Sequence, residues 1–286
     1  MNTQIAELEL RSIRYRQTIL TSIARAGTGH TGGSLSCVDI LNVLYNAVLR
    51  INPADPAWPD RDRYVHSKGH AVEALYVVLA DKGYYPAEML ETMGRAGSHW
   101  VGHPTRKVPG VEHNTGALGH GLSVAVGMAL AAKKDRRSYR VFILLGDGEL
   151  TEGSVWEASM SASFYKLDNL TVVVDRNGLQ ITGCTEEVMA LEPLAERFRA
   201  FGYAVRTVDG HDVAALVDIF SQVPFEVGKP SLILARTVKG KGVSFMEDAV
   251  GWHHRVPTAE ELEAALAELD HAERCWRERY GGDGAW

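Results

Sequence analysis

Two polar turns in the middle of the chain could bind a metal ion and a phosphate. Asp147 follows a short apolar run at residues 141–145, and Asn177 comes soon after a second run at residues 170–174. Such short, wholly apolar runs are typical of strands buried on both faces of a parallel sheet. Ligands bind beyond the carboxyl ends of these strands, so we expect Asp147 and Asn177 to share one edge if the strands are neighbours. One carboxylate, one amide oxygen and a nearby backbone carbonyl are hard oxygen ligands, which suit Mg²⁺ or Ca²⁺ completed by phosphate and water.

The glycines on either side of Asp147 favour the same interpretation. Gly148 would let a phosphate approach backbone N–H groups, and the N-terminus of a helix predicted at residues 153–166 would favour an anion. Taken singly, a Gly-Asp-Gly tripeptide is more often an ordinary polar turn. The tripeptide Gly282-Asp283-Gly284 has no strand before it, and we assign that copy no role.

Histidines form the second group of residues that could do chemistry. The chain has 11, and seven of them precede residue 121. Two pairs stand four residues apart, His66 with His70 and His99 with His103. Such spacing can indicate zinc, but Gly69 and residues 102–104 interrupt a regular helix, and no cysteine or third ligand is evident. Structural zinc is therefore the weaker interpretation.

Two glycine-rich motifs each have an alternative reading. Residues 27–32 match the pattern GxGxxG, but a dinucleotide fingerprint requires a preceding strand, and the periodicity of a helix precedes this one. Lys239 and Lys241 lie in a Lys-Gly-Lys-Gly turn. They could contact an anion, and a solvated loop is an equal alternative.

Helices and strands alternate along most of the chain. Apolar periodicity predicts a first helix at residues 5–23 that ends at Gly27, a loop at 27–33, and a second helix that begins with a capping box at Ser36–Asp39. Residues 50–115 are punctuated by proline, and only 71–79 are predicted to be helical there. Further helices are predicted at 116–132, 213–223 and 258–280, and further strands at 203–208 and 232–235. Strand–helix–strand units of this kind predict a doubly wound α/β fold with a parallel sheet, in a single domain over residues 1–286.

Composition excludes several classes of protein. Apolar residues make up 45% and charged residues 23%, and the net charge is -6, so the chain is predicted to be globular and to bind no nucleic acid. No apolar run is long enough for a membrane helix, and no signal peptide is recognisable. Three widely spaced cysteines favour a reduced, cytoplasmic protein, in which Cys37 and Cys184 are predicted to be packing residues.

A set of motifs resembles one family of enzymes. Gly146-Asp147-Gly148, Glu152-Gly153 and Asn177 resemble the thiamine-diphosphate motif, in its usual strand–turn–helix–strand context. Further segments resemble successive signatures of transketolase: Gly29-His30, Asp62-Arg63-Tyr64-Val65, Lys68-Gly69-His70, Gly102-His103-Pro104, Pro109-Gly110-Val111-Glu112 and the run from Thr115 to Gly121. The resemblance covers nearly the whole chain, and together these motifs are specific.

This resemblance implies a role for each matching residue. Asp147, Asn177 and the carbonyl of Leu179 would hold Mg²⁺, for which Ca²⁺ could substitute. The diphosphate of the cofactor, thiamine diphosphate, would receive hydrogen bonds from His70, His253 and the N–H of Gly148. The rest of the cofactor would lie against Gly116, Ala117 and Leu118.

The resemblance also implies roles in catalysis and assembly. His30, His103 and His253 would surround the reacting sugar, where a side chain that titrates near working pH is useful. Glu152 would also be a catalytic residue: it would lie at a subunit interface and relay to the carboxylate that activates the cofactor. Two departures are visible: Gly178 follows Asn177 where many thiamine enzymes have a second asparagine, and His120 stands where transketolases commonly have glutamine.

The chain resembles only the first part of a transketolase. We expect it to be the N-terminal subunit of a split enzyme, active only with a C-terminal, pyrimidine-binding partner in an α₂β₂ heterotetramer. Together the subunits would transfer a two-carbon ketol unit from a ketose or ketose phosphate to an aldose. Two alternatives stay open: the α subunit of a 2-oxo acid dehydrogenase, and a noncatalytic module that binds thiamine diphosphate. The substrates themselves cannot be predicted from the chain.

Overall fold

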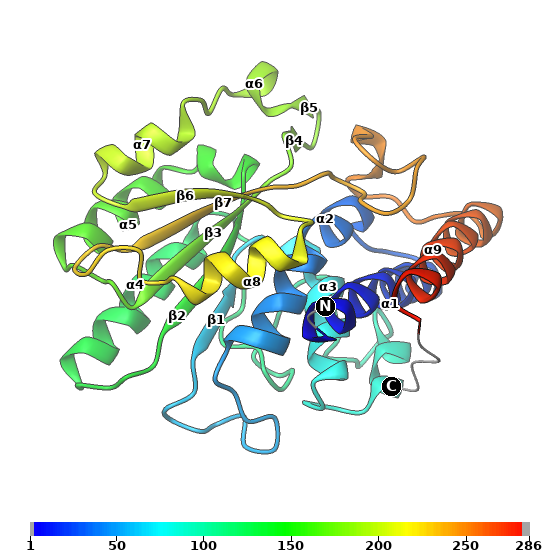
Figure 1. Cartoon of the computed structure of the whole chain (residues 1–286), viewed down its shortest axis with the longest axis horizontal. Coiled ribbons are helices and arrows are strands. Elements are labelled where there is room, and N and C mark those ends of the chain that lie inside the picture. Colours follow the sequence, from blue (N-terminus) through cyan, green and yellow to red (C-terminus); the bar gives the residue numbers. More distant parts are fainter. Residues whose placement is uncertain (1–2, 282–286) are drawn as a thin grey trace.

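A five-stranded parallel sheet forms the centre of the computed structural model, which describes residues 3–281 (Figure 1). The strands are β1 (Arg63–His66), β2 (Val141–Gly146), β3 (Leu170–Arg176), β6 (Ala204–Asp209) and β7 (Ser231–Arg236), in the order β1-β2-β3-β7-β6. Every pairing in this sheet is parallel. The predicted fold class is confirmed. The repeat of Gly-Asp-Gly at the C-terminus lies outside the described residues.

Helices cover both faces of the sheet. The longer ones are α1 (Thr3–Ala26), α2 (Thr31–Val43), α3 (Val72–Asp81), α4 (His120–Lys134), α5 (Gly153–Phe164), α7 (Leu194–Ala200), α8 (Val213–Ser221) and α9 (Ala259–Tyr280). Shorter elements are α6 (Thr185–Val188), the hairpin of β4 (Leu179–Gln180) with β5 (Gly183–Cys184), and the turns η1 (Leu44–Val48), η2 (Gly69–Ala71), η3 (Ala87–Thr92), η4 (Gly148–Thr151) and η5 (Val250–Trp252). Figure 1 shows α4, α5 and α7 on one side of the sheet, and α1, α2, α3 and α8 on the other.

The apolar runs explain this layering. Val141, Ile143 and Leu145 of β2 belong to the core cluster that packs against α4, α5 and α7. Phe142 and Leu144 belong to the cluster beneath α1, α2, α3 and α8. Successive side chains of a strand point to opposite faces, so a strand covered on both faces must be apolar throughout.

Three sequence predictions are wrong in the first half of the chain. The second helix begins at Thr31, and Ser36 is buried inside it, where its hydroxyl bonds Asp175 instead of capping the helix. Residues 63–66 form the edge strand β1, although only two of the four residues, Tyr64 and Val65, are apolar. The predicted helix at 116–132 begins only at His120, because Gly119 has a left-handed φ of 84°.

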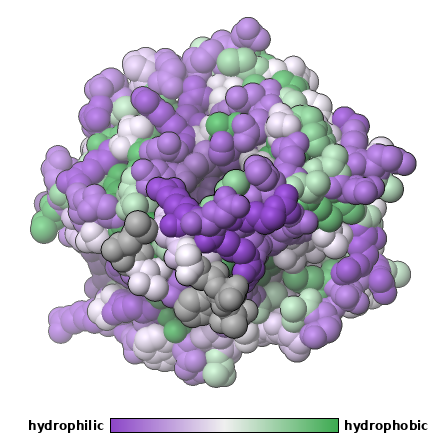
Figure 2. Space-filling view, turned by 45° about the vertical axis from the view of Figure 1, so that its right-hand side comes forward, coloured by the Kyte–Doolittle hydropathy of each residue, from purple (hydrophilic) through white to green (hydrophobic). Residues whose placement is uncertain are grey.

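The last helix, α9, buries few of its side chains. Only Ala265 and Leu269 of α9 are buried. Figure 2 brings this side of the molecule forward, and its centre is strongly hydrophilic. None of the described helices is long and apolar enough to cross a membrane. Cys37 is buried as predicted and Cys184 is half-buried, whereas Cys275 is exposed.

Candidate active site

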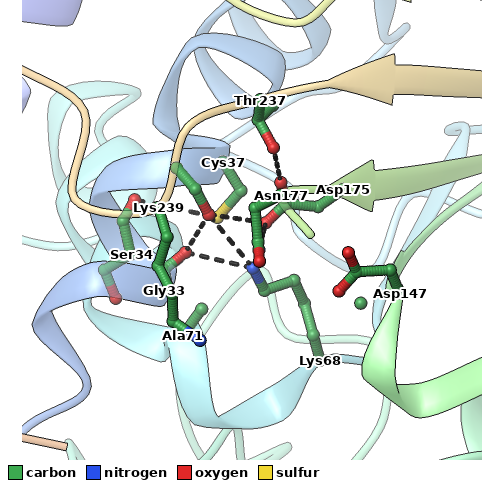
Figure 3. Close-up of polar contacts among 12 residues, drawn as sticks. Gly33, Ser34, Cys37, Lys68, Ala71, Asp147, Asp175, Asn177, Thr237 and Lys239 are labelled. Carbon is green, nitrogen blue, oxygen red and sulfur yellow. Dashed lines mark hydrogen bonds and ion pairs between the residues drawn. The ribbon is translucent and has the colours of Figure 1, made fainter. Parts of the chain in front are cut away.

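A cavity of about 220 Å³ lies at the carboxyl ends of β2 and β3. Nine residues predicted as site residues line it: His30, His70, Gly116, Leu118, Asp147, Gly148, Asn177, Leu179 and His253. Three other predicted site residues, Ala117, His103 and Glu152, are exposed outside this lining. β2 and β3 are neighbours in the sheet, with Gly146 paired to Asp175, so the predicted meeting of the two polar turns at one edge is confirmed. Figure 3 shows the side chain of Asn177 next to the amine of Lys68, with Asp147 to the right of both.

The Asp147 carboxylate is fixed by donors from both turns. It accepts hydrogen bonds from the backbone N–H groups of Gly148 at 2.8 Å and Gly178 at 2.7 Å, and from Arg176 Nη1 at 3.0 Å. Burial of this side chain raises the pKa of Asp147, and its donors act in the opposite direction. This nearly buried carboxylate already pairs with the Arg176 guanidinium, and a metal ion bound here would share it with that cation.

The other two predicted metal ligands also have oxygen atoms in this region. Asn177 Oδ1 accepts the N–H of Leu179 at 3.1 Å, and the carbonyl of Leu179 accepts a hydrogen bond from Lys239 Nζ at 3.2 Å. The Leu179 carbonyl therefore already attracts a cation. The described residues contain no cluster of three or more His, Cys, Asp or Glu that could hold a metal. A set with a single carboxylate fits Mg²⁺ when an anionic cofactor supplies further oxygens.

A fully buried ion pair supports the floor of the cavity. Lys68 Nζ pairs with Asp175 Oδ2 and also lies 3.1 Å from the carbonyl of Gly33 (Figure 3). Asp175 accepts three further hydrogen bonds, from the hydroxyls of Ser36 and Thr237 and from Asn177 Nδ2 at 3.4 Å. Burial lowers the pKa of Lys68, but the adjacent carboxylate overcomes this and leaves that pKa raised. The sequence places Lys68 within a family signature but gives no sign of this role.

Lys239 is buried against the cavity and not in a solvated loop, which corrects one of the two interpretations of its turn. Only 2% of this residue is exposed, and its Nζ lies 2.8 Å from His253 Nδ1. Burial, helped by the charge of Lys68, lowers the pKa of Lys239 to about 8. The amine therefore keeps its positive charge near neutral pH while it faces the space where we expect a diphosphate.

Imidazole rings cluster around His30, the residue that precedes α2. The ring centroids of His70, His103 and His253 lie 5.2, 6.1 and 5.7 Å from that of His30. Burial, with neighbouring cationic groups, lowers the pKa of His30 to about 4 and that of His253 to about 3. Both rings are therefore neutral at pH 7. Among the residues that the structure describes, the buried Nδ1 atom of His30 has no hydrogen-bond partner, which is unusual for a buried polar atom.

His254 joins this cluster, and sequence reasoning assigned it no role. Its ring centroid lies 4.5 Å from that of His30, although His254 itself is exposed. No local spacing signals that this ring reaches a residue more than two hundred positions earlier.

Glu73 fixes the start of α2 from below the histidine cluster. Its carboxylate accepts the N–H of His30 at 3.3 Å and the hydroxyl of Ser34 at 2.8 Å. Burial raises the pKa of Glu73 to about 7. Gly29 is needed here, since an added Cβ would lie 2.8 Å from the Glu73 carboxylate and 2.7 Å from Ile23.

A second missed carboxylate, Glu149, holds the two walls of the cavity together. It accepts hydrogen bonds from the backbone N–H groups of Gly119 at 2.9 Å and Gly146 at 3.1 Å, and from the hydroxyl of Ser67. The turn that carries Gly116 and Leu118 is thereby tied to the end of β2. Glu152, which follows closely in the sequence, is instead exposed at the start of α5.

Comparison with known proteins defines the class of this site. Residues 10–272 match the family described as "Transketolase, thiamine diphosphate binding domain". The chain is 48% identical over 279 residues to one subunit of the apulose-4-phosphate transketolase of Phocaeicola vulgatus, covering 97% of this chain and 99% of that protein. It is 44% identical to the 6-deoxy-6-sulfo-D-fructose transketolase subunit SqwG of a Clostridium species, covering 94% of this chain and 98% of that one. The chain belongs to the transketolase family.

Solved structures agree with this assignment. The transketolase of Leishmania mexicana superimposes with a TM-score of 0.86 at 27% identity, over 95% of this chain and 46% of that one. The Campylobacter jejuni transketolase gives 0.81 at 31% identity, over 100% of this chain and 49% of that chain. The chain thus spans about half the length of these solved transketolases, but nearly the whole length of the two subunits named above. The predicted family is confirmed.

Proposed function

We propose that this chain is the thiamine-diphosphate-binding, N-terminal subunit of a two-chain transketolase, and that residues 1–286 form one domain. The observation that carries the proposal is the match to subunit-length relatives over nearly their whole length, combined with a cavity lined by nine of the predicted site residues. This combination favours a transketolase over the α subunit of a 2-oxo acid dehydrogenase or a noncatalytic module.

The oxygen atoms at the carboxyl ends of β2 and β3 would hold the cofactor through a metal ion. Asp147, Asn177 and the carbonyl of Leu179 would bind Mg²⁺, or Ca²⁺ in its place. His70, His253 and the Gly148 N–H would donate to the diphosphate, and Lys239 would add its charge. Gly116, Ala117 and Leu118 would contact the organic part. Bound thiamine diphosphate supplies the electron sink needed to cleave the bond beside a ketose carbonyl.

Neutral imidazoles around His30 would orient the sugar and move its protons. A neutral ring has one donor and one acceptor nitrogen, so it can accept a proton from a hydroxyl or donate one to an oxygen. The unpaired Nδ1 of His30 is the best-placed atom for such a hydrogen bond. His103 and His253 approach the same ring from opposite loops and would complete the sugar site.

A partner chain would complete the active site. We propose a pyrimidine-binding, C-terminal transketolase subunit, an α₂β₂ heterotetramer in the cytoplasm, and Glu152 at the interface between subunits, where its exposed position leaves it accessible. Sugars or sugar phosphates would be the substrates. The two relatives named for particular ketose derivatives suggest ketoses with a terminal anionic group as the first donors to test.

Reconstitution with a candidate partner tests this function. The chain alone, supplied with thiamine diphosphate and Mg²⁺, is expected to give no ketol transfer, and the mixture is expected to turn over a ketose donor with an aldose acceptor. Asp147→Ala should abolish Mg²⁺-dependent cofactor binding, while Asp55→Ala, on an exposed turn, should leave it unchanged. Full turnover by the chain alone, or activity with 2-oxo acids in place of ketoses, would contradict the proposal.

A further inference from the structure

His211 lies outside the lining of the cavity, in the turn between β6 and α8, and touches two elements that shape that cavity. Its Nδ1 lies 2.7 Å from Asp39 Oδ2 on α2, and its Nε2 accepts the backbone N–H of Val238 at 2.8 Å. Because Nε2 accepts a proton donor, the ring proton resides on Nδ1 and is donated to Asp39. The ring therefore links α2 to the segment that follows β7.

The α2 end of this link, at Asp39, is held in place by Arg16. Asp39 is buried and forms a two-point ion pair with Arg16, whose Nη1 and Nη2 lie 3.0 and 2.6 Å from its two carboxylate oxygens. Arg16 Nε also donates to the carbonyl of Lys241 at 2.8 Å. The turn at residues 238–241 is thus held at its first residue by His211 and at its last by Arg16.

This turn carries Lys239 into the cavity. The Lys239 amine contacts the Leu179 carbonyl and His253, and the next residue, Gly240, donates its N–H to the carbonyl of Gly32 on α2 at 3.1 Å. Movement of the backbone at Val238 would therefore displace the amine, because Val238 directly precedes Lys239. The N–H of Val238 is accepted by His211, a residue to which the family resemblance gives no role.

The turn that presents His211 is packed too tightly to drift. Gly210 donates its N–H to the carbonyl of Arg236 at 2.7 Å, and an added Cβ at Gly210 would lie 2.4 Å from the Thr237 side chain. The backbone at 210–211 therefore lies directly against the backbone at 237–238. A shallow surface hollow borders His211 on its other side, among Arg236, Lys241 and Asp209.

We propose that His211 is a positioning residue: its Nε2 holds the Val238 N–H, and this fixes Lys239 toward the diphosphate of the cofactor. The proposal rests on the proposed function for its effect on cofactor affinity. The proposal concerns Nε2 alone, and two amide substitutions of different length can separate its contact with Val238 from the contact of Nδ1 with Asp39. In His211→Asn the amide can reach Asp39 but not Val238, whereas in His211→Gln the longer side chain can place an acceptor near Val238.

The test compares these two variants by hydrogen exchange and by cofactor affinity. Exchange at residues 237–241 is expected to be about tenfold faster in His211→Asn than in the unaltered chain, because a protecting hydrogen bond is lost, and close to normal in His211→Gln. In the complex with the partner chain and Mg²⁺, His211→Asn should weaken thiamine diphosphate binding about tenfold, and His211→Gln should restore it to within about threefold.

Equal exchange and equal affinity in the two variants, or a weaker His211→Gln, would overturn the positioning role, since Asp39 would then be the contact that matters. If the unaltered complex bound no thiamine diphosphate, the proposed function would fail instead. The exchange comparison would still accept or reject His211 as the residue that holds the turn.

Discussion

Replacing Lys68 by methionine removes the cation of the fully buried ion pair and keeps most of its aliphatic stem. Lys68 and Asp175 have side chains that are 1% and 0% exposed, so water cannot compensate the carboxylate that remains. Two hydroxyl donors, on Ser36 and Thr237, still reach Asp175. Removing one partner of a buried pair typically costs about 3–5 kcal/mol. We expect Lys68→Met to fall at the lower end of this range, because both hydroxyls stay.

A double variant tests whether the unpaired charge is the cause. Asp175→Asn in the Lys68→Met background removes that charge and keeps an oxygen acceptor, so we expect it to restore about 2 kcal/mol. Urea unfolding at pH 7, followed by circular dichroism, measures the free energies of unfolding, and unchanged m-values make them comparable. A loss below about 1 kcal/mol in Lys68→Met, or a double variant no more stable than the single one, would refute the reasoning.

Three further predictions concern packing, pH and the sugar site. In α4, Gly121→Ala should destabilise the chain by about 2 kcal/mol, because the added Cβ would lie 2.6 Å from Ser67 Cβ. Gly127→Ala, in the same helix but with open space around it, should instead stabilise the chain by about 0.5–1 kcal/mol. Thermal unfolding of the two variants checks this. His66 is buried, and burial lowers its pKa to about 3, so the unfolded state binds more protons than the folded state between pH 6.5 and 3. The unaltered chain therefore loses stability as the pH falls from 7 to 5, and the free energy of unfolding of His66→Gln should rise by about 2 kcal/mol relative to it over this range. Urea unfolding at the two pH values measures this, and a difference that does not change with pH would contradict it. His103→Ala should lower kcat/KM of the reconstituted enzyme at least tenfold and leave cofactor affinity unchanged, because His103 reaches His30 but does not line the cavity. An equal loss in kcat/KM and in cofactor affinity would place His103 against the cofactor instead.

Local signals in the sequence predict the centre of the fold well. Residues 141–145 of β2 are all apolar, and Thr171 is the one polar residue among 170–174 of β3, because both faces of these strands are covered. Parallel pairing of the two strands then brings the polar turns that follow them to one edge. The placement of Asp147 and Asn177 at one edge then depends only on the two strands being neighbours, as they are in the sheet. The edge strand β1 escapes prediction because it is short and mixes polar with apolar residues.

Contacts between distant segments explain what the sequence could not predict. Lys68 and Asp175 are 107 positions apart, and nothing in the spacing of either residue indicates that they pair. Ser36 has the pattern of a helix cap, but its hydroxyl serves that same buried pair from inside α2. Lys239 belongs to a glycine-rich turn that is typical of solvated loops, but its amine is buried against two segments that are distant in the sequence or separated by a loop, at the Leu179 carbonyl and at His253.

The position of a bound divalent cation tests the central claim most directly. Crystals of the complex with its partner chain, grown with thiamine diphosphate and Mn²⁺ in place of Mg²⁺, would locate the metal by its anomalous scattering. We predict a single strong peak within bonding distance of an Asp147 carboxylate oxygen, Asn177 Oδ1 and the Leu179 carbonyl, with the diphosphate against the same ion. A peak elsewhere, or a diphosphate bound with no cation at Asp147, would contradict the proposed site.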